Sequence, residues 1–151
     1  MTTIFDYDGL IKKVGQCCLT EEECGTCAKE NCLIGYCKES ILTCLKKQDG
    51  FLADGMANLP VADTKVYDPN AITQALGFLL HQCRNCYLYH DDDCLLNIIR
   101  SSLEIIIFGE SLDFMGSALA YLNEIKDKNP EMAAKIAEVY QSLQESSGNN
   151  N

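Results

Sequence analysis

Apolar residues recur at intervals of three and four along most of the chain, and polar helix-start and helix-stop signals separate these runs. Thr20 and Glu23 form a capping box, which predicts a helix that runs to about Asn31. Gly35 is expected to interrupt this helical region. A second helix is then expected over roughly 36–48, where an aspartate and a glycine follow.

A loop and two further helices are predicted after this point. Residues 49–68 contain glycines, a proline and several aspartates, and this composition is typical of a loop. The pair at 68–69 is an aspartate followed by a proline, which predicts a helix that runs to about Tyr87. The acidic run 91–93 opens the next helix, because carboxylates stabilise the positive end of the helix dipole. Gly109 is expected to close it.

The remaining pattern predicts two helices joined by a short turn. Ser111 is expected to cap the first helix, residues 126–129 form the turn, and Asn129 with Pro130 starts the second helix. The apolar positions are Leu112, Met115, Leu119 and Leu122 in the first helix, and Met132, Ile136, Val139 and Leu143 in the second. Two such helices with a short turn form an antiparallel hairpin.

Together these elements predict an all-α fold with five to seven helices. We expect a single compact domain over residues 1–145, in which the C-terminal antiparallel hairpin packs on a cysteine-rich helical half. Residues 146–151 are polar and are expected to form a disordered tail. The chain has 151 residues and 47% of them are apolar, so a core can form without cross-links. The ten cysteines therefore need another explanation.

Charge and composition limit the partners and the compartment. Twelve Lys and Arg residues against 22 Asp and Glu residues give a net charge of −10. Such a chain repels nucleic acids and anionic membranes, and it suits a protein partner with a basic docking surface. Residues 1–10 lack the pattern of a secretory signal, and the stretch 95–108 is too short and too polar to span a bilayer. We therefore expect a cytoplasmic protein.

Cysteine-rich cytoplasmic proteins more often bind metal or perform redox chemistry than form disulfides, although an even count of ten also permits five disulfides. Seven cysteines precede the predicted loop and three follow it. Both groups contain a Cys-x2-Cys pair followed by a third cysteine and an apolar segment, which is a weak internal repeat. The candidate metal ligands are Cys24, Cys27, Cys32 and Cys37 in the first group, and Cys83, Cys86, His90 and Cys94 in the second.

The first group places four thiols within a short stretch that Gly25 and Gly35 allow to wrap. This density is more typical of iron–sulfur ligation than of a zinc finger. The series from Cys24 to Cys37 resembles the cysteine-rich start of hybrid-cluster proteins and carbon monoxide dehydrogenases, where closely spaced cysteines on short helices hold a cubane cluster. The resemblance covers only these residues, and the spacing differs.

The second group reaches four ligands only with His90. Its order resembles the Cys-Cys-His-Cys order of zinc knuckles, but each of the last two gaps differs from the knuckle pattern by one residue. On a continuous helix the four side chains would span about 16 Å, too far for one metal ion. A break at the acidic run 91–93 would bring Cys94 back toward the others.

Other residues have simpler explanations. Cys44 is expected to be a core residue, Cys17 and Cys18 are core residues or a peripheral thiol pair, and His81 is expected to be structural. No phosphate-binding loop and no catalytic dyad is apparent, so we expect a protein that is not an enzyme by itself.

The sequence therefore predicts a cysteine-ligated metal protein. We expect an iron–sulfur cluster and an electron-transfer or redox-accessory role for a larger enzyme. The first alternative is a zinc-stabilised helical interaction module without redox function. The second alternative is a thiol–disulfide oxidoreductase.

Overall fold

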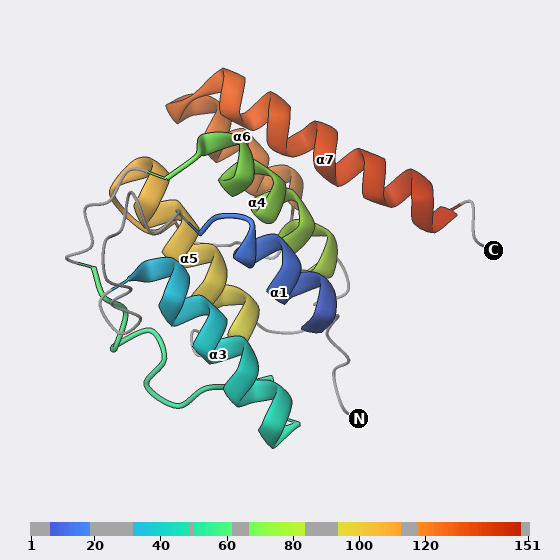
Figure 1. The fold of residues 1–151 in the computed structure, drawn as a ribbon. Helices are drawn as coiled ribbons and strands as arrows, with labels where there is room; N and C mark the ends of the chain where they lie inside the picture. Colours follow the sequence, from blue (N-terminus) through green and yellow to red (C-terminus); the bar gives the residue numbers. More distant parts are fainter. Residues whose placement is uncertain are drawn as a thin grey trace.

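The computed structural model of the chain describes residues 7–18, 32–48, 50–61, 67–83, 94–112 and 118–148. These residues form six helices: α1 (Tyr7–Gly15), α3 (Leu33–Lys47), α4 (Pro69–Cys83), α5 (Leu95–Phe108), α6 (Ala118–Lys128) and α7 (Pro130–Gly148) (Figure 1). The described residues contain no strand, and Phe51 and Cys94 form an isolated antiparallel bridge. The predicted all-α fold is confirmed.

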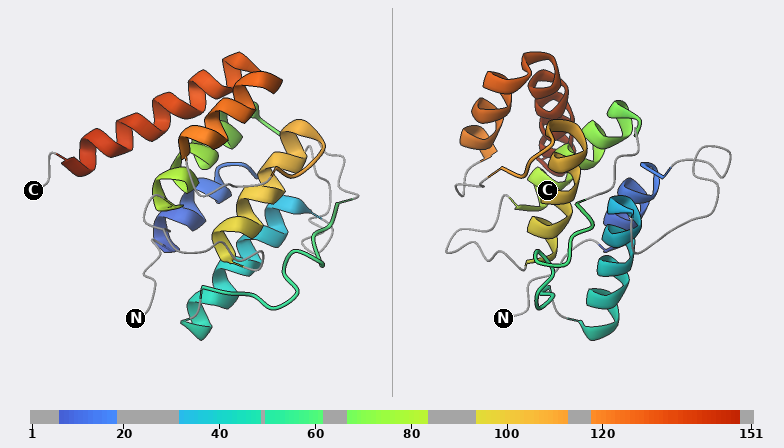
Figure 2. Two further views of the ribbon diagram at one scale, coloured as in Figure 1. Left: turned by 180° about the vertical axis from the view of Figure 1, so that it is seen from behind. Right: turned by 90° about the vertical axis from the view of Figure 1, so that its left-hand side faces the viewer.

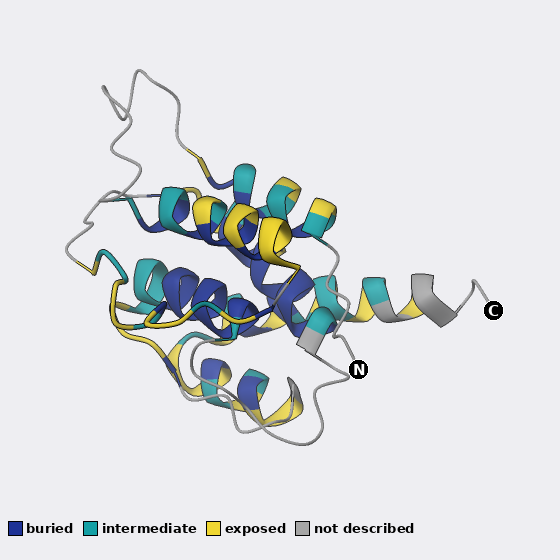
Figure 3. Cartoon of the chain, turned by 90° about the horizontal axis from the view of Figure 1, so that it is seen from below, coloured by how far each residue is buried: buried dark blue, intermediate teal, exposed yellow. Residues whose placement is uncertain are grey.

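Four of the helices enclose the core. α1 packs against α3 and α4, and α5 packs against the same two helices, so the four elements form a closed ring of contacts. The views in Figure 2 show these helices grouped on one side of α6 and α7. Figure 3 shows that buried residues gather where the helices meet and exposed residues lie on their outer faces. The first ten residues of α5 are all buried.

The last two helices form the predicted hairpin. Only Asn129 separates α6 from α7, and its Oδ1 accepts a hydrogen bond of 3.2 Å from the backbone N–H of Met132. This contact caps the N-terminus of α7. The hairpin packs on the four-helix group mainly through α7 and α4. In Figure 1, α7 lies along one edge and its C-terminal part extends beyond the other helices.

Two predicted helix boundaries are confirmed by local geometry. Asp68 caps α4, because its Oδ1 accepts a hydrogen bond of 3.1 Å from the backbone N–H of Asn70. Gly109 ends α5 with a φ of 80°, in the left-handed region, and its N–H donates to the carbonyl of Ile105. The left-handed conformation explains why a glycine stands there.

Other boundaries differ from the prediction. The prediction that Gly35 interrupts the helical region and that the next helix starts at about residue 36 is wrong, because Gly35 lies in the first turn of α3. The five apolar residues that α3 buries stabilise it by more than the roughly 1 kcal/mol that a glycine costs. No element was expected where α1 lies. α7 continues to Gly148, three residues past the expected end of the domain. The predicted helix at 20–31 lies outside the described residues.

None of the described helices combines the length and the apolar character that crossing a membrane requires.

Candidate metal centre

The described cysteines are free thiols, namely Cys17, Cys18, Cys32, Cys37, Cys44 and Cys94. With six of the ten cysteines free, the alternative of five disulfides is wrong. Three of the eight predicted ligands are among them: Cys32, Cys37 and Cys94. Cys83 is the last residue of α4, and its side chain is not among those described. Cys24, Cys27, Cys86 and His90 lie outside the described residues.

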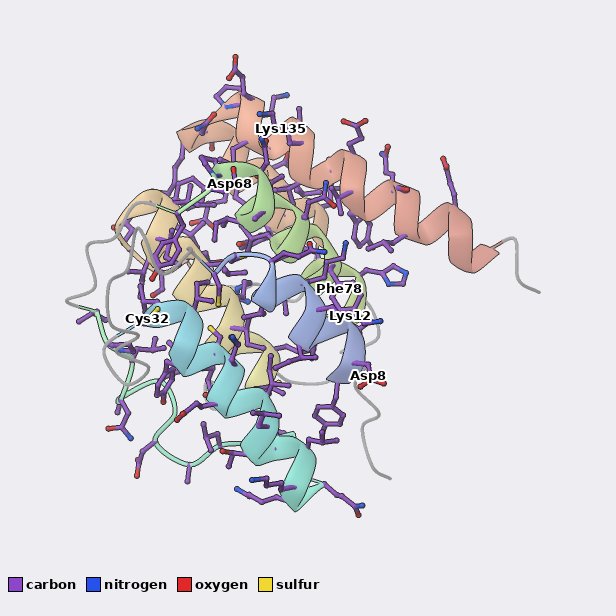
Figure 4. The ribbon with its side chains drawn as sticks, in the orientation of Figure 1. Asp8, Lys12, Cys32, Asp68, Phe78 and Lys135 are labelled. Carbon is purple, nitrogen blue, oxygen red and sulfur yellow. The ribbon has the colours of Figure 1, made fainter. Side chains whose placement is uncertain are left out.

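Four cysteines lie after α1 and at the start of α3, and we call Cys17, Cys18, Cys32 and Cys37 the thiol group. Cys17 and Cys18 lie two and three positions after the end of α1. Cys32 is the N-cap of α3 and is labelled in Figure 4. Burial raises the pKa of Cys37 to about 12, a hydrogen bond from Ser102 of α5 lowers it, and the nearby Cys17 and Cys32 raise it further. Cys17 and Cys32 therefore lie within electrostatic range of Cys37.

The sulfur of Cys32 has two hydrogen-bonding groups next to it. Its sulfur accepts a hydrogen bond of 3.4 Å from the backbone N–H of Gly35, and it lies 3.1 Å from the hydroxyl of Tyr67. The first contact caps the N-terminus of α3, where the helix dipole favours a negative charge. Tyr67 could not be selected from the sequence, because 35 positions separate it from Cys32.

The other three thiols differ in exposure. Cys17 and Cys37 are buried, with 1% and 0% of their surface exposed. Burial raises the pKa of Cys17 to about 12, and the charges of Cys18 and Asp68 add to the rise, so both buried thiols stay protonated at neutral pH. Cys18 is exposed, and the ammonium of Lys38 lies 3.4 Å from its sulfur. The interpretation of Cys17 as a core residue holds, whereas Cys18 is at the surface.

Cys44 and Cys94 both contact Phe51, in the loop that follows α3. Cys44 is fully buried, as expected, and its sulfur lies 4.0 Å from the carbonyl of Phe51. Phe51 pairs with Cys94, and the backbone N–H of Leu95 donates to the carbonyl of Gly50. Cys94 thereby joins the N-terminus of α5 to the loop after α3.

The spacing along α3 and α5 separates Cys94 from the thiol group. Cys44 lies seven positions after Cys37, about 10 Å along the helix axis. Cys94 lies eight positions before Ser102, which contacts Cys37, and this is about 12 Å along α5. Ligands of one metal ion lie within about 5 Å of each other, given metal–sulfur bonds of about 2.3 Å. Cys37 and Cys94 therefore do not share a mononuclear site in this arrangement.

No three His, Cys, Asp or Glu side chains among the described residues are arranged to hold a metal ion. A metal at the thiol group would therefore need a ligand from another part of the chain. Residues 19–31 join Cys18 to Cys32 and contain Cys24 and Cys27. Both ends of this segment are thus attached to the thiol group.

A groove of about 490 Å³ lies between α1, α4 and α7. It is lined by Lys13, Asn70, Thr73, Gln74, Lys135, Glu138, Val139, Ser142 and Leu143. This lining contains no cysteine or histidine, so the groove offers neither thiol chemistry nor soft metal ligands.

Comparisons of the chain with protein families, with curated proteins and with solved structures gave no match.

Proposed function

We propose that this protein binds an iron–sulfur cluster through the cysteines at the N-terminal end of α3, and that it serves electron transfer or another accessory redox role for a larger enzyme. One observation carries this proposal: the segment with Cys24 and Cys27 begins and ends at the thiol group. Cys24, Cys27 and Cys32 can therefore supply three thiolates to one cluster.

The surroundings of Cys32 support its role as a ligand. A metal-bound cysteine is a thiolate, and hydrogen bonds to the sulfur stabilise that form and orient the side chain. Cys32 has both the backbone N–H of Gly35 and the hydroxyl of Tyr67 within reach of its sulfur. A structural core cysteine does not need two such polar neighbours.

Cys37 and Cys18 are the two candidates for the fourth ligand. Cys37 is the residue that the sequence predicts, and its ligation would release a proton from a thiol whose pKa burial raises to about 12. Cys18 is exposed and directly precedes the segment 19–31. Cluster content in Cys37→Ala and Cys18→Ala variants separates the two candidates, because replacement of the true ligand destabilises the cluster and replacement of the other does not.

The sequence leaves open whether the two cysteine groups share one site, and we propose that the second group forms a separate site with Cys83, Cys86, His90 and Cys94 as ligands. Cys83 ends α4 and Cys94 precedes α5, and the connecting residues 84–93 contain the other two ligands. Loss of a second metal equivalent in Cys94→Ala, with the first equivalent retained, is the expected result.

The charge on α1 and α3 refines the proposed partner. α1 and α3 together carry five lysines and two acidic residues, although the whole chain has a net charge of −10. We therefore propose that the partner surface that faces α3 is acidic, and that a basic partner surface would contact other parts of the chain. A Lys38→Glu variant should weaken a complex formed at α3, whereas Lys126→Glu on α6 should not.

Metal analysis of protein expressed and purified without oxygen tests the proposal. We expect iron, inorganic sulfide and a broad absorbance at about 400 nm. Stoichiometric zinc in a colourless protein that a chelator unfolds would support the zinc-stabilised interaction module instead. Absence of metal together with a reversible two-electron thiol couple would support a thiol–disulfide oxidoreductase. Each of the last two results contradicts the iron–sulfur proposal.

A further inference from the structure

We infer that the exposed side of α3 is a docking surface for an acidic amphipathic helix of a partner protein. This surface, which we call the α3 face, consists of Leu42 and Leu45 together with Lys38 and Lys46. The inference rests on the proposed function in one respect, because that function includes a protein partner. It requires no metal and no cysteine.

The α3 face contains a pair of apolar side chains in contact with water. Leu42 and Leu45 are 46% and 45% exposed. They lie three positions apart, so their side chains adjoin on the helix surface. The other side of α3 packs against α1 and α5 and buries Ile34, Cys37 and Ile41. Because the core does not use the leucine pair, burial of the pair against a partner would be favourable.

Lysines flank the leucine pair. Lys38, Leu42 and Lys46 follow one another at intervals of four positions, so they form one row along the helix. The ammonium of Lys38 lies 3.4 Å from the sulfur of Cys18, at the edge where α1 meets the α3 face. Together α1 and α3 hold five of the twelve Lys and Arg residues but only two of the 22 Asp and Glu residues. The α3 face is therefore complementary to carboxylates, unlike the acidic chain as a whole.

The same features argue against other occupants. Two copies that met through the α3 face would place lysines against lysines, because a two-fold contact uses the same surface on both sides. The net charge of −10 repels the chain from an anionic membrane. The described residues contain no strand that a partner peptide could extend. A helix that packs along α3 remains, with apolar positions against the leucines and Asp and Glu opposite the lysines.

The experiment measures the binding of two designed helical peptides to the full chain by fluorescence anisotropy. Both peptides carry leucines at intervals of three and four positions, and the leucines are flanked by Glu in one peptide and by Lys in the other. We expect the acidic peptide to bind at least about tenfold more tightly than the basic one, and its affinity should fall as salt is added. Binding to vesicles of anionic lipid and self-association in sedimentation are measured in parallel, and we expect neither.

A matched set of variants tests whether the peptide binds at the α3 face. Leu42→Ala/Leu45→Ala removes the apolar pair, and alanine preserves the helix. Leu119→Ala on α6 removes a leucine that is 71% exposed and lies outside the α3 face. The double leucine variant should bind the acidic peptide about tenfold more weakly, whereas Leu119→Ala should keep the wild-type affinity. Lys38→Glu/Lys46→Glu should reverse the preference between the two peptides.

Two further measurements keep the test independent of any one variant. Circular dichroism should give the same unfolding midpoint for the wild type and the double leucine variant, because both leucines are exposed. Nuclear magnetic resonance of the labelled wild type needs no substitution, and the backbone signals of α3 should shift when the acidic peptide is added. Shifts that are confined to other helices would contradict the inference.

Failure of the inference can be told apart from failure of the proposed function. Absence of binding, equal affinity for the two peptides, or equal affinity of the double leucine variant and Leu119→Ala overturns the inference and leaves the iron–sulfur proposal standing. Binding to anionic vesicles, or self-association that the double leucine variant abolishes, also overturns it. A protein without iron that binds the acidic peptide through the α3 face contradicts the proposed function and supports the inference.

Discussion

Arg100 and Glu104 form an ion pair inside the helical core, with Nε of Arg100 3.0 Å from Oε2 of Glu104 and both side chains almost fully buried. Arg100 also donates to the side chain of Asn97 and to the carbonyl of Leu112. Glu104 accepts from the backbone N–H of Leu112 and from the hydroxyl of Tyr121. The pair therefore links α5 to the residues that follow it and to α6.

Replacement of one partner should destabilise the protein strongly. Arg100→Met leaves Glu104 buried without its cation, and we expect a loss of about 3–5 kcal/mol in the free energy of unfolding. The double variant Arg100→Met/Glu104→Gln should lose less than the sum of the single variants, because the uncompensated charge is gone. Urea unfolding at neutral pH measures both effects, and additive losses would contradict a coupled pair.

The free energy of unfolding of the single variant Arg100→Met should depend on pH. Burial raises the pKa of Glu104, and Arg100 acts against this rise, so removal of Arg100 raises the pKa further. Because the pKa in the folded state is then well above the unfolded value of 4.5, the folded state gains the proton first as the pH falls. Arg100→Met should therefore regain stability, relative to the wild type, between neutral pH and about 4.5. A deficit that stays constant over this range would contradict the assignment.

The contact between α4 and α7 should not tolerate a larger residue at Gly77. A Cβ atom at this position would lie 2.5 Å from Cγ1 of Val139 and 3.3 Å from the carbonyl of Ile136. We expect Gly77→Ala to lower the free energy of unfolding by about 1–3 kcal/mol, and Val139→Ala to relieve part of the loss. Thermal unfolding followed by circular dichroism measures the change.

Gly15 is the matched control, because a Cβ atom there meets no atom within 4 Å. Gly15→Ala should be neutral or stabilise α1 by up to about 1 kcal/mol. An equal loss in both alanine variants would mean that Gly77 does not mark a close helix contact.

The metal-free, reduced protein should lose stability in alkali. Burial raises the pKa of Cys17 and of Cys37 from 9.0 to about 12, so the unfolded state releases these protons first as the pH rises. Below pH 9.0 both thiols are protonated in the folded and the unfolded state, so the free energy of unfolding does not change with their ionisation. Between pH 9.0 and about 12, each thiol should lower the free energy of unfolding by about 1.4 kcal/mol per pH unit. Urea unfolding between pH 8 and pH 11 should give a shallower slope for Cys17→Ala than for the wild type. Equal slopes would contradict the burial of Cys17.

The helix boundaries that the sequence predicted correctly depend on local chemistry. The side chains of Asp68 and Asn129 accept hydrogen bonds from backbone N–H groups two and three positions later, and Gly109 adopts the left-handed conformation that ends a helix. Such local effects can be recognised in the sequence. The break expected at Gly35 was wrong because tertiary packing outweighs the intrinsic preference of one glycine. α1 was missed, although Leu10, Val14 and Cys17 recur at helical spacing and are all buried.

The candidate site could be predicted only in part. Cys32 and Cys37 are near each other in the sequence, so their spacing identifies them as a pair. Cys17 lies near Cys37, and Tyr67 lies beside Cys32. Both contacts depend on how the helices pack, and the sequence spacing does not reveal them. The burial of Arg100 and Glu104 likewise follows from the central place of α5, and their polar side chains gave no sign of it.

We propose that Cys32 is a ligand of an iron–sulfur cluster, and the iron and sulfide content of two alanine variants tests this proposal most directly. Cys32 is at the N-terminus of α3, and Cys44 is a buried thiol that lies 12 positions further along the same region of the chain. Purified without oxygen, Cys44→Ala should keep the iron and sulfide of the wild type per folded chain, whereas Cys32→Ala should lose most of both. A wild-type protein without iron, or a Cys32→Ala variant that retains the full content, would contradict the account.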